Sequence, residues 1–211
     1  SKGKDDRKDQ SYVLWGLTQS CLERSSFPLG GYSKPEIRQM AKDFGYEDLS
    51  KKPESYEICF VPDNDYRGFL KRRVPGLEDR VKGGTFVNAK GDFLGNHEGY
   101  PFYTVGQRKG LGGGFKTPMF VTEILPETNT VVLGEVDELI RNGMSVGQIN
   151  LMKYAAIHDG MEAVTQVRYN DKGVLASLHP KGDQINVNFF ANVRGIAPGQ
   201  SAVFYEGDDV I

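Results

Sequence analysis

Apolar residues recur at helical spacing in the first fifth of the chain. Leu14, Leu17 and Cys21 fall at intervals of three and four, which places them on one face of a helix and predicts that Cys21 is buried in its core. A second helix is marked by the segment Ser33-Lys-Pro-Glu36, which has the pattern of a capping box with proline just inside the start. Gly45 follows as a stop signal. The pattern therefore predicts two helices.

Two short elements are expected next. Residues 56–61 are apolar and partly β-branched, which suits a short buried strand with Cys59 in its middle. Residues 63–73 fit an amphipathic helix. Its predicted inner face holds Tyr66, Phe69 and Leu70, and its predicted outer face holds Arg67, Lys71, Arg72 and Arg73.

Beyond residue 75 the pattern changes to that of β structure. Glycines recur every few residues between short apolar runs such as 85–87 and 102–105, which is typical of hairpins. After residue 143 the candidate strands are 146–152, 163–169, 174–178, 184–190 and 201–205. Ile185, Val187 and Phe189 alternate with asparagines, so one side of that strand is expected to cover a core.

These elements predict an α+β fold in three parts. Residues 1–62 form a helical connector that ends near Cys59, residues 63–140 a small central β-rich domain, and residues 141–211 a C-terminal antiparallel β-barrel. An apolar share of 38% over 211 residues is enough for a real core, so a wholly disordered chain is excluded.

The composition bears on where the protein works in the cell and on whether it binds a metal. No apolar run approaches the roughly 18 residues needed to cross a bilayer, and the charged start SKGKDDRKDQ lacks the apolar stretch of a signal peptide. We therefore expect a cytoplasmic protein without a membrane partner. Two cysteines and three scattered histidines give no ligand spacing, so no metal site is expected.

The net charge of −2 is unevenly distributed. Residues 1–118 carry 20 Lys and Arg against 16 Asp and Glu, whereas residues 119–211 carry 6 against 12. The first part therefore has a net charge of +4 and the second −6. Because phosphate contacts dominate nucleic-acid affinity, such a ligand is expected to lie mainly on the first part.

Two features suggest chemistry but are open to two interpretations. Cys59 lies between basic segments, which would favour its thiolate, yet its apolar neighbours Ile58 and Phe60 equally fit a buried small side chain. The segment Gly106–Gly114 matches neither a P-loop nor a dinucleotide-binding loop. It is either a basic loop that follows a nucleic-acid backbone or an ordinary glycine-rich turn.

Six motifs in order along the chain resemble the tRNA-specific 2-thiouridylases, which replace the C2 oxygen of the wobble uridine with sulfur. The motifs are Lys8-Asp-Gln-Ser-Tyr-Val-Leu-Trp15, Phe27-Pro-Leu-Gly30, Glu57-Ile-Cys-Phe60, Gly95-Asn-His-Glu-Gly99, Tyr103-Thr-Val-Gly-Gln-Arg-Lys-Gly-Leu111 and Pro198-Gly-Gln-Ser-Ala-Val-Phe-Tyr205. The resemblance covers essentially the whole chain. It implies that the substrate and partner is tRNA.

The resemblance also implies a mechanism. In the family, ATP adenylates the uracil C2 oxygen, and a persulfide on a cysteine then delivers sulfur that comes from a sulfur-carrier protein or a cysteine desulfurase. By its place in E-I-C-F, that cysteine is Cys59. The family's S-G-G-x-D-S phosphate loop and first catalytic cysteine are absent from this sequence. The chain therefore resembles the C-terminal portion, with ATP bound elsewhere, and is expected to be inactive alone.

Further positions match family segments that contact tRNA. They are Lys8, Asp9 and Gln10; Gln107, Arg108 and Lys109; Arg168 and Tyr169; and Gln200. Cations can hold phosphates, and a tyrosine ring can stack on a base. The alternatives are a helix start capped by Asp9 and ordinary exposed strand residues. His97 is expected to be a turn residue and not a catalyst.

Two other function classes remain possible at this point. A non-catalytic RNA-binding module would have an unreactive Cys59, seen as slow alkylation at neutral pH. A stand-alone persulfide sulfurtransferase would pass sulfur to a protein or thiol in the absence of nucleotide.

Overall fold

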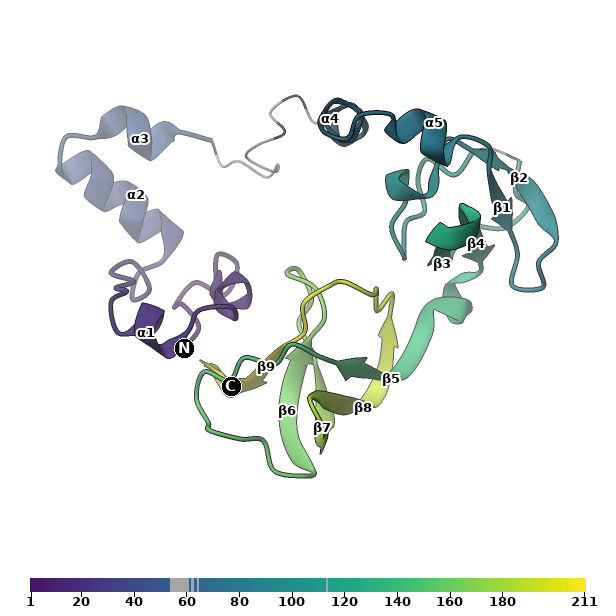
Figure 1. The fold of residues 1–211 in the computed structure, drawn as a ribbon. Coiled ribbons are helices and arrows are strands. Elements are labelled where there is room, and N and C mark those ends of the chain that lie inside the picture. Colours follow the sequence, from purple (N-terminus) through teal and green to yellow (C-terminus); the bar gives the residue numbers. More distant parts are fainter. Residues whose placement is uncertain (54–60, 62, 64, 113) are drawn as a thin grey trace. The chain divides into compact units, whose positions relative to one another are not determined.

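The computed structural model describes residues 1–53, 61, 63, 65–112 and 114–211, which form two compact units (Figure 1). The flanking unit combines Ser1–Glu54, Asn142–Ala191 and Gln200–Ile211, and the central unit combines Ser55–Arg141 with Asn192–Gly199. The N-terminal segment thus packs with the C-terminal sheet, to which the chain returns after the central unit.

The central unit is built on a four-stranded sheet with the order β2-β1-β4-β3. The strands are β1 (Gly84–Val87), β2 (Phe93–His97), β3 (Phe120–Leu125) and β4 (Thr130–Gly134), and only β1 and β4 are parallel. Its helical elements are α4 (Tyr66–Arg73), α5 (Leu77–Val81), η2 (Tyr100–Phe102), η3 (Pro126–Thr128) and η4 (Val136–Leu139).

The core of the central unit lies against this sheet. Phe86 on β1, Val121 on β3 and Leu133 on β4 are buried, and Val81 of α5 and Phe102 of η2 pack on them. Burial of apolar area at about 25 cal/mol per Å² holds the two short helices to the sheet.

The flanking unit combines helical turns with a six-stranded sheet. The helical elements are η1 (Ser11–Leu14), α1 (Gln19–Leu22), α2 (Lys34–Asp43) and α3 (Glu47–Lys51). The strands are β5 (Ile140–Val146), β6 (Met161–Gln166), β7 (Val174–Lys181), β8 (Gln184–Arg194), β9 (Val203–Glu206) and β10 (Asp209–Val210), in the order β10-β9-β6-β7-β8-β5.

Several sequence predictions are confirmed. The α+β class is correct, and the capping box of Ser33 and Glu36 begins α2. Gly45 ends that helix with a left-handed φ of 83°, which only glycine adopts without cost. On β8 the side chains of Ile185, Val187 and Phe189 are buried, as the alternation predicted.

The expected C-terminal barrel is present as a six-stranded sheet that, within the part of the chain that the structure describes, is not closed, because the edge strands β5 and β10 do not pair with each other and β10 has two residues. Two of the predicted short strands are wrong. Residue 102 ends η2, a 3-10 turn that begins at Tyr100 and has Pro101 in its middle, and residues 103–105 form a loop. The segment after Val146, expected as a strand to residue 152, follows the end of β5.

Two side chains also face the opposite way from the prediction. Cys21 is exposed, because α1 is a single turn without buried residues. Tyr66 is 45% exposed at the first position of α4, where its hydroxyl donates to the carbonyl oxygen of Pro101 at 3.2 Å.

The predicted strand at 56–61 lies outside the described residues except for Val61, which is buried. No helix among the described residues is long and apolar enough to cross a membrane.

Candidate nucleic-acid interface

The flanking unit brings together three of the segments that the sequence marked for RNA contact. The hydroxyl of Tyr169 donates to the backbone carbonyl of Asp9 at 3.2 Å. The ring of Tyr12 meets that of Tyr169 edge to face, with centroids 6.1 Å apart, and its hydroxyl donates to the carbonyl of Ser201 at 2.7 Å. The contact between Tyr12 and Tyr169 therefore lies next to residues 8–10, 168–169 and 200.

Asp9 is held by the fold itself. Its carboxylate accepts hydrogen bonds from the backbone N–H groups of Gly3 and Ser11, at 2.8 and 3.3 Å, and from the Ser11 hydroxyl. The Ser11 hydroxyl also lies 3.1 Å from the buried hydroxyl of Tyr205. Asp9 thus lies just before η1, whose N-cap is Gln10, and its hydrogen bonds fix the main chain beside Lys8 and Gln10.

The side chains around this contact are exposed to solvent to different degrees. Lys8, Gln10 and Gln200 are exposed, Tyr169 is 44% exposed and Arg168 is half-buried. Arg168 and Tyr169 lie in the turn that follows β6. Two cations, two amides and an accessible ring are the groups with which proteins hold RNA phosphates and stack on its bases.

Burial keeps the supporting tyrosines protonated. Desolvation raises the pKa of Tyr12, an effect that the nearby Arg168 partly offsets. Burial likewise raises the pKa of Tyr205, and its hydrogen bond with Ser11 opposes that rise. Both hydroxyls therefore remain donors at neutral pH. Ser11, Tyr12 and Tyr205 were not among the predicted site residues, although all three lie inside the motifs that carry the family resemblance.

In the central unit, Gln107 shapes the loop that contains Arg108 and Lys109. Its side-chain oxygen accepts from the N–H of Thr104 at 3.1 Å, and its amide donates to the carbonyl of Lys109 at 2.8 Å. Main-chain bonds with Val121, in both directions, fasten the loop to β3. With Gln107 engaged in this way, the exposed Arg108 and Lys109 are the groups that the loop presents to solvent.

Arg67 is a neighbour of this loop that the sequence analysis placed outward. Its guanidinium pairs with Glu98 at 3.0 Å and lies over the rings of Phe102 and Tyr103, at 5.7 and 5.5 Å from their centroids. It also lies beside Gly110. A helical periodicity that assigns every arginine to solvent misses a cation that stacks on aromatic rings.

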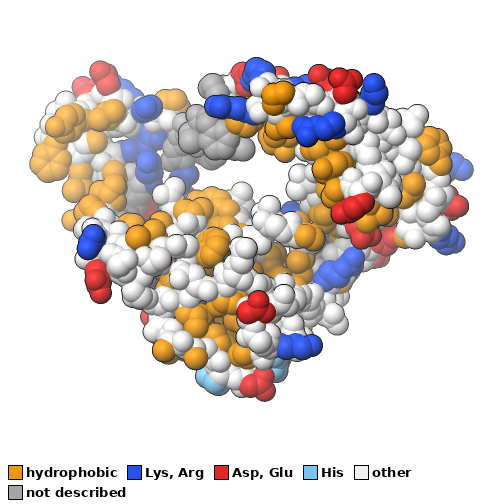
Figure 2. Space-filling view, viewed as in Figure 1, with side chains coloured by type: hydrophobic (Ala, Val, Ile, Leu, Met, Phe, Trp, Pro, Cys, Tyr) orange, Lys and Arg blue, Asp and Glu red, His pale blue; other side chains and the backbone are white. Residues whose placement is uncertain are grey.

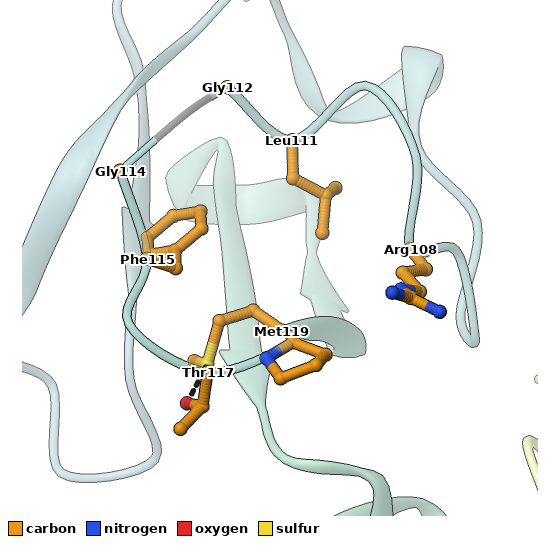
Figure 3. Close-up of a pocket in the computed structure, with 8 residues that line it drawn as sticks. Arg108, Leu111, Gly112, Gly114, Phe115, Thr117 and Met119 are labelled. Carbon is orange, nitrogen blue, oxygen red and sulfur yellow. Dashed lines mark hydrogen bonds between the residues drawn. The ribbon is translucent and has the colours of Figure 1, made fainter.

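A pocket of about 200 Å³ opens between the basic loop and the start of β3 (Figure 3). It is lined by Arg108, Leu111, Gly112, Gly114, Phe115, Thr117, Pro118 and Met119. Figure 3 shows the side chains of Leu111 and Phe115 directed into the space that the loop encircles, with Arg108 on the far side from Phe115.

His97 serves packing. Its Nδ1 accepts from the N–H of Gly99 at 3.0 Å, and its ring meets Phe86 edge to face at 4.9 Å. Burial lowers its pKa, so the ring is neutral at pH 7. Its buried Nε2 has no hydrogen-bond partner among the described residues.

Cys59, the predicted persulfide carrier, lies outside the described residues. Within the described ranges, no group of three histidine, cysteine or acidic side chains is arranged to hold a metal ion. The glycine-rich segment 106–114 lies in the connection between the 3-10 turn η2 and the strand β3, an arrangement unlike the strand–loop–helix of a nucleotide-binding phosphate loop.

Three family models match successive parts of the chain. Residues 1–63 match the "tRNA methyl transferase HUP domain", residues 67–135 the "tRNA methyl transferase PRC-barrel domain" and residues 141–211 the "Aminomethyltransferase beta-barrel domain". Two of these descriptions name methyl transfer and the third aminomethyl transfer, whereas the curated relatives carry a different name.

Those relatives are tRNA-specific 2-thiouridylases MnmA. The protein of Amoebophilus asiaticus is 58% identical, that of Cytophaga hutchinsonii 57% and that of Salinibacter ruber 51%, each over the whole of this chain. The matched regions are 56%, 58% and 55% of the respective relatives. The chain thus spans little more than half the length of the relatives it matches.

Proposed function

The chain belongs to the family of the tRNA-specific 2-thiouridylases, and we propose that it holds tRNA while Cys59 delivers sulfur to C2 of the wobble uridine. The observation that carries the proposal is the cluster around Tyr12 and Tyr169, at which the segments of Lys8, Arg168 and Gln200 meet. Identities above 50% to named thiouridylases support the same chemistry.

The sulfur transfer is proposed to run through a persulfide on Cys59. Its terminal sulfur forms the new bond to C2, and the C2–O bond breaks. A second thiol of the parent enzyme then attacks the Cys59 sulfur, so that the S–S bond breaks, the sulfur stays on the uridine and a disulfide remains. ATP supplies the leaving group by adenylating the C2 oxygen. Sulfur is a soft nucleophile and leaving group, which explains why a cysteine is needed here.

The remaining components are proposed to come from outside these 211 residues. ATP and the second thiol are assigned to the part of the parent enzyme that the matched relatives contain and this chain does not span. A sulfur-carrier protein or a cysteine desulfurase is the expected donor to Cys59.

The first 50 residues offer a surface for that other part. Large apolar side chains are exposed there. They are Val13, Phe27, Leu29, Tyr32, Phe44, Tyr46 and Leu49. Figure 2 shows hydrophobic side chains on the surface in the region of α2 and α3. An exposed apolar patch of this kind marks an interaction site, and we expect the preceding part of the parent enzyme to cover it.

The recognition residues are assigned by chemistry. Lys8, Arg108, Lys109 and Arg168 are proposed to neutralise phosphates, Tyr169 to stack on a base, and Gln10 and Gln200 to bond base or sugar edges. Asp9 and Gln107 are proposed to act by shaping the segments that carry them, because their side chains bond to the protein itself.

The test is thiolation of tRNA by the full-length parent with ATP, a cysteine desulfurase and cysteine. Cys59→Ser is expected to abolish 2-thiouridine formation, and mass spectrometry is expected to find the sulfur adduct on Cys59. The matched control is Cys21→Ser, which changes an exposed cysteine on α1 and is expected to retain activity. Full activity of Cys59→Ser, or an adduct on Cys21 alone, would refute the assignment.

A parallel assay with the 211-residue chain separates the roles of the two halves. We expect it to bind tRNA but to form no 2-thiouridine, because the adenylation site and the second thiol are assigned elsewhere. Product formation by the short chain would contradict that division, and sulfur transfer without nucleotide would favour a stand-alone sulfurtransferase.

A further inference from the structure

We propose that the pocket lined by Arg108, Leu111, Phe115, Thr117 and Met119 takes up one unpaired base of the bound RNA. The phosphate next to that base would lie on Arg108 and Lys109. The inference rests on the proposed function and adds to it a base-binding site in the central unit, separate from the residues of the flanking unit.

The walls of the pocket are fixed by the core beneath them. Leu111 is buried in the core cluster of the central unit, and Phe115 and Met119 pack against the same cluster. The hydroxyl of Thr117 lies 3.2 Å from the carboxylate of Glu135 and 3.9 Å from the Met119 sulfur. These side chains are therefore held in place before RNA binds, so that ordering them costs little conformational entropy.

The chemistry of the walls suits a flat, aromatic ligand. Leucine, proline, methionine and phenylalanine line the space together with Arg108, Thr117 and two glycines, so a base can meet an aromatic ring with its π-face and polar groups with its edges. Its volume of about 200 Å³ is smaller than the roughly 300–1,000 Å³ of pockets for drug-sized molecules and cofactors. One base fits this space better than a whole dinucleotide.

The charge around the pocket complements a phosphate backbone. Residues 99–122 contain Arg108, Lys109 and Lys116 and no aspartate or glutamate. Across the ranges that the structure describes, none of these three cations has a carboxylate within 4.0 Å. Cations that are not neutralised by the protein are the ones a phosphate gains most from meeting.

The test compares tRNA binding by the 211-residue chain and by Phe115→Leu, which keeps an apolar side chain but removes the ring. We expect affinity to fall about 5-fold or more at every salt concentration, with an unchanged salt slope, because stacking and not charge is lost. The matched control is Phe93→Leu on β2, which changes an exposed phenylalanine of the same unit and is expected to leave affinity within 2-fold.

A second variant guards against a folding defect in the first. Thr117 is exposed at the pocket, so Thr117→Phe is expected to fold and to fill the space, with the same loss of affinity. A thermal melt of each variant shows whether it is folded. If Phe115→Leu is unfolded, the Thr117→Phe result decides.

A fluorescent base then locates the contact. Anticodon stem-loops with 2-aminopurine at single loop positions are expected to show quenching at one position with the wild-type chain, and to lose it with Phe115→Leu or Thr117→Phe. Unchanged affinity and unchanged quenching in both variants would overturn the pocket while the proposed function stands. Failure of the wild-type chain to bind tRNA would refute both.

Discussion

The hydroxyl of Tyr169 donates a hydrogen bond at 3.2 Å to the backbone carbonyl of Asp9, 160 positions earlier in the sequence. The bond joins the turn after β6 to the start of η1, and both ends carry residues proposed to contact tRNA. This hydroxyl therefore contributes to the spacing between Lys8 and Arg168, which no local pattern in the sequence determines.

Removing that hydroxyl is expected to weaken tRNA binding. Tyr169→Phe keeps the ring but loses a hydrogen bond worth about 0.5–1.5 kcal/mol, so a 2- to 10-fold loss of affinity is expected if the bond positions both segments. Filter binding with tRNA measures it. Tyr154→Phe is the matched control, because it removes a hydroxyl that bonds only Glu206 in the same unit. Equal affinities of both variants would mean that the Tyr169 bond does not position the RNA-binding residues.

The salt dependence of binding tests the basic loop. Replacing Arg108 and Lys109 together by glutamine is expected to make the salt dependence weaker. The negative slope of the logarithm of the tRNA association constant against the logarithm of the salt concentration should become smaller in magnitude by about 1.4–1.8, the value for two lost phosphate contacts. The control is the double change of Lys82 and Lys90, two exposed lysines of the central unit outside the loop. A slope that does not change in the loop variant would make the loop an ordinary glycine-rich turn.

Local sequence rules predicted the elements whose causes are local. The capping box at Ser33 and the left-handed Gly45 determine both ends of α2, and the alternation along β8 follows from its one buried face. The rules failed at Cys21 and Arg67, because the environment of each is set by distant parts of the chain: α1 has no core beside it, and Arg67 lies over aromatic rings of residues 102 and 103.

The candidate site, too, could be predicted from the sequence only in part. The resemblance identified Lys8, Arg168 and Gln200 from their motifs, yet their meeting at Tyr12 depends on the packing of residues 1–54 against the C-terminal sheet. The pocket at Phe115 was not predicted, since its walls come from side chains that the core of the central unit orients.

Packing around His97 predicts a strict requirement for glycine at position 84. A Cβ atom on Gly84 would lie 2.1 Å from His97 Cε1 and 2.8 Å from the side-chain oxygen of Asn129. Gly84→Ala is therefore expected to destabilise the protein by about 1–3 kcal/mol, measured by urea unfolding.

A second substitution separates this clash from a backbone effect. Adding His97→Ala creates the space that the new methyl group needs, so the double variant is expected to be more stable than the sum of the two single effects predicts. Strictly additive changes would show that the ring of His97 is not what excludes a side chain at position 84.

The start of α2 is expected to weaken in acid because of Glu36. The backbone N–H of Ser33, then its hydroxyl and then the ammonium of Lys4 lower the pKa of Glu36 from 4.5 to about 2. Because the pKa of Glu36 is lower in the folded state than in the unfolded state, the ionised carboxylate stabilises the fold at pH values above 4.5, and that contribution is lost as the pH falls from 4.5 to about 2.

Glu36→Gln, which keeps a capping oxygen without the charge, is expected to be less stable than wild type at pH 6. The difference should vanish near pH 2. Urea unfolding across this range measures it, with Asp43→Asn, at the other end of α2, as the control. A difference between Glu36→Gln and wild type that persists unchanged at pH 2 would show that the charge of Glu36 contributes nothing to the capping box.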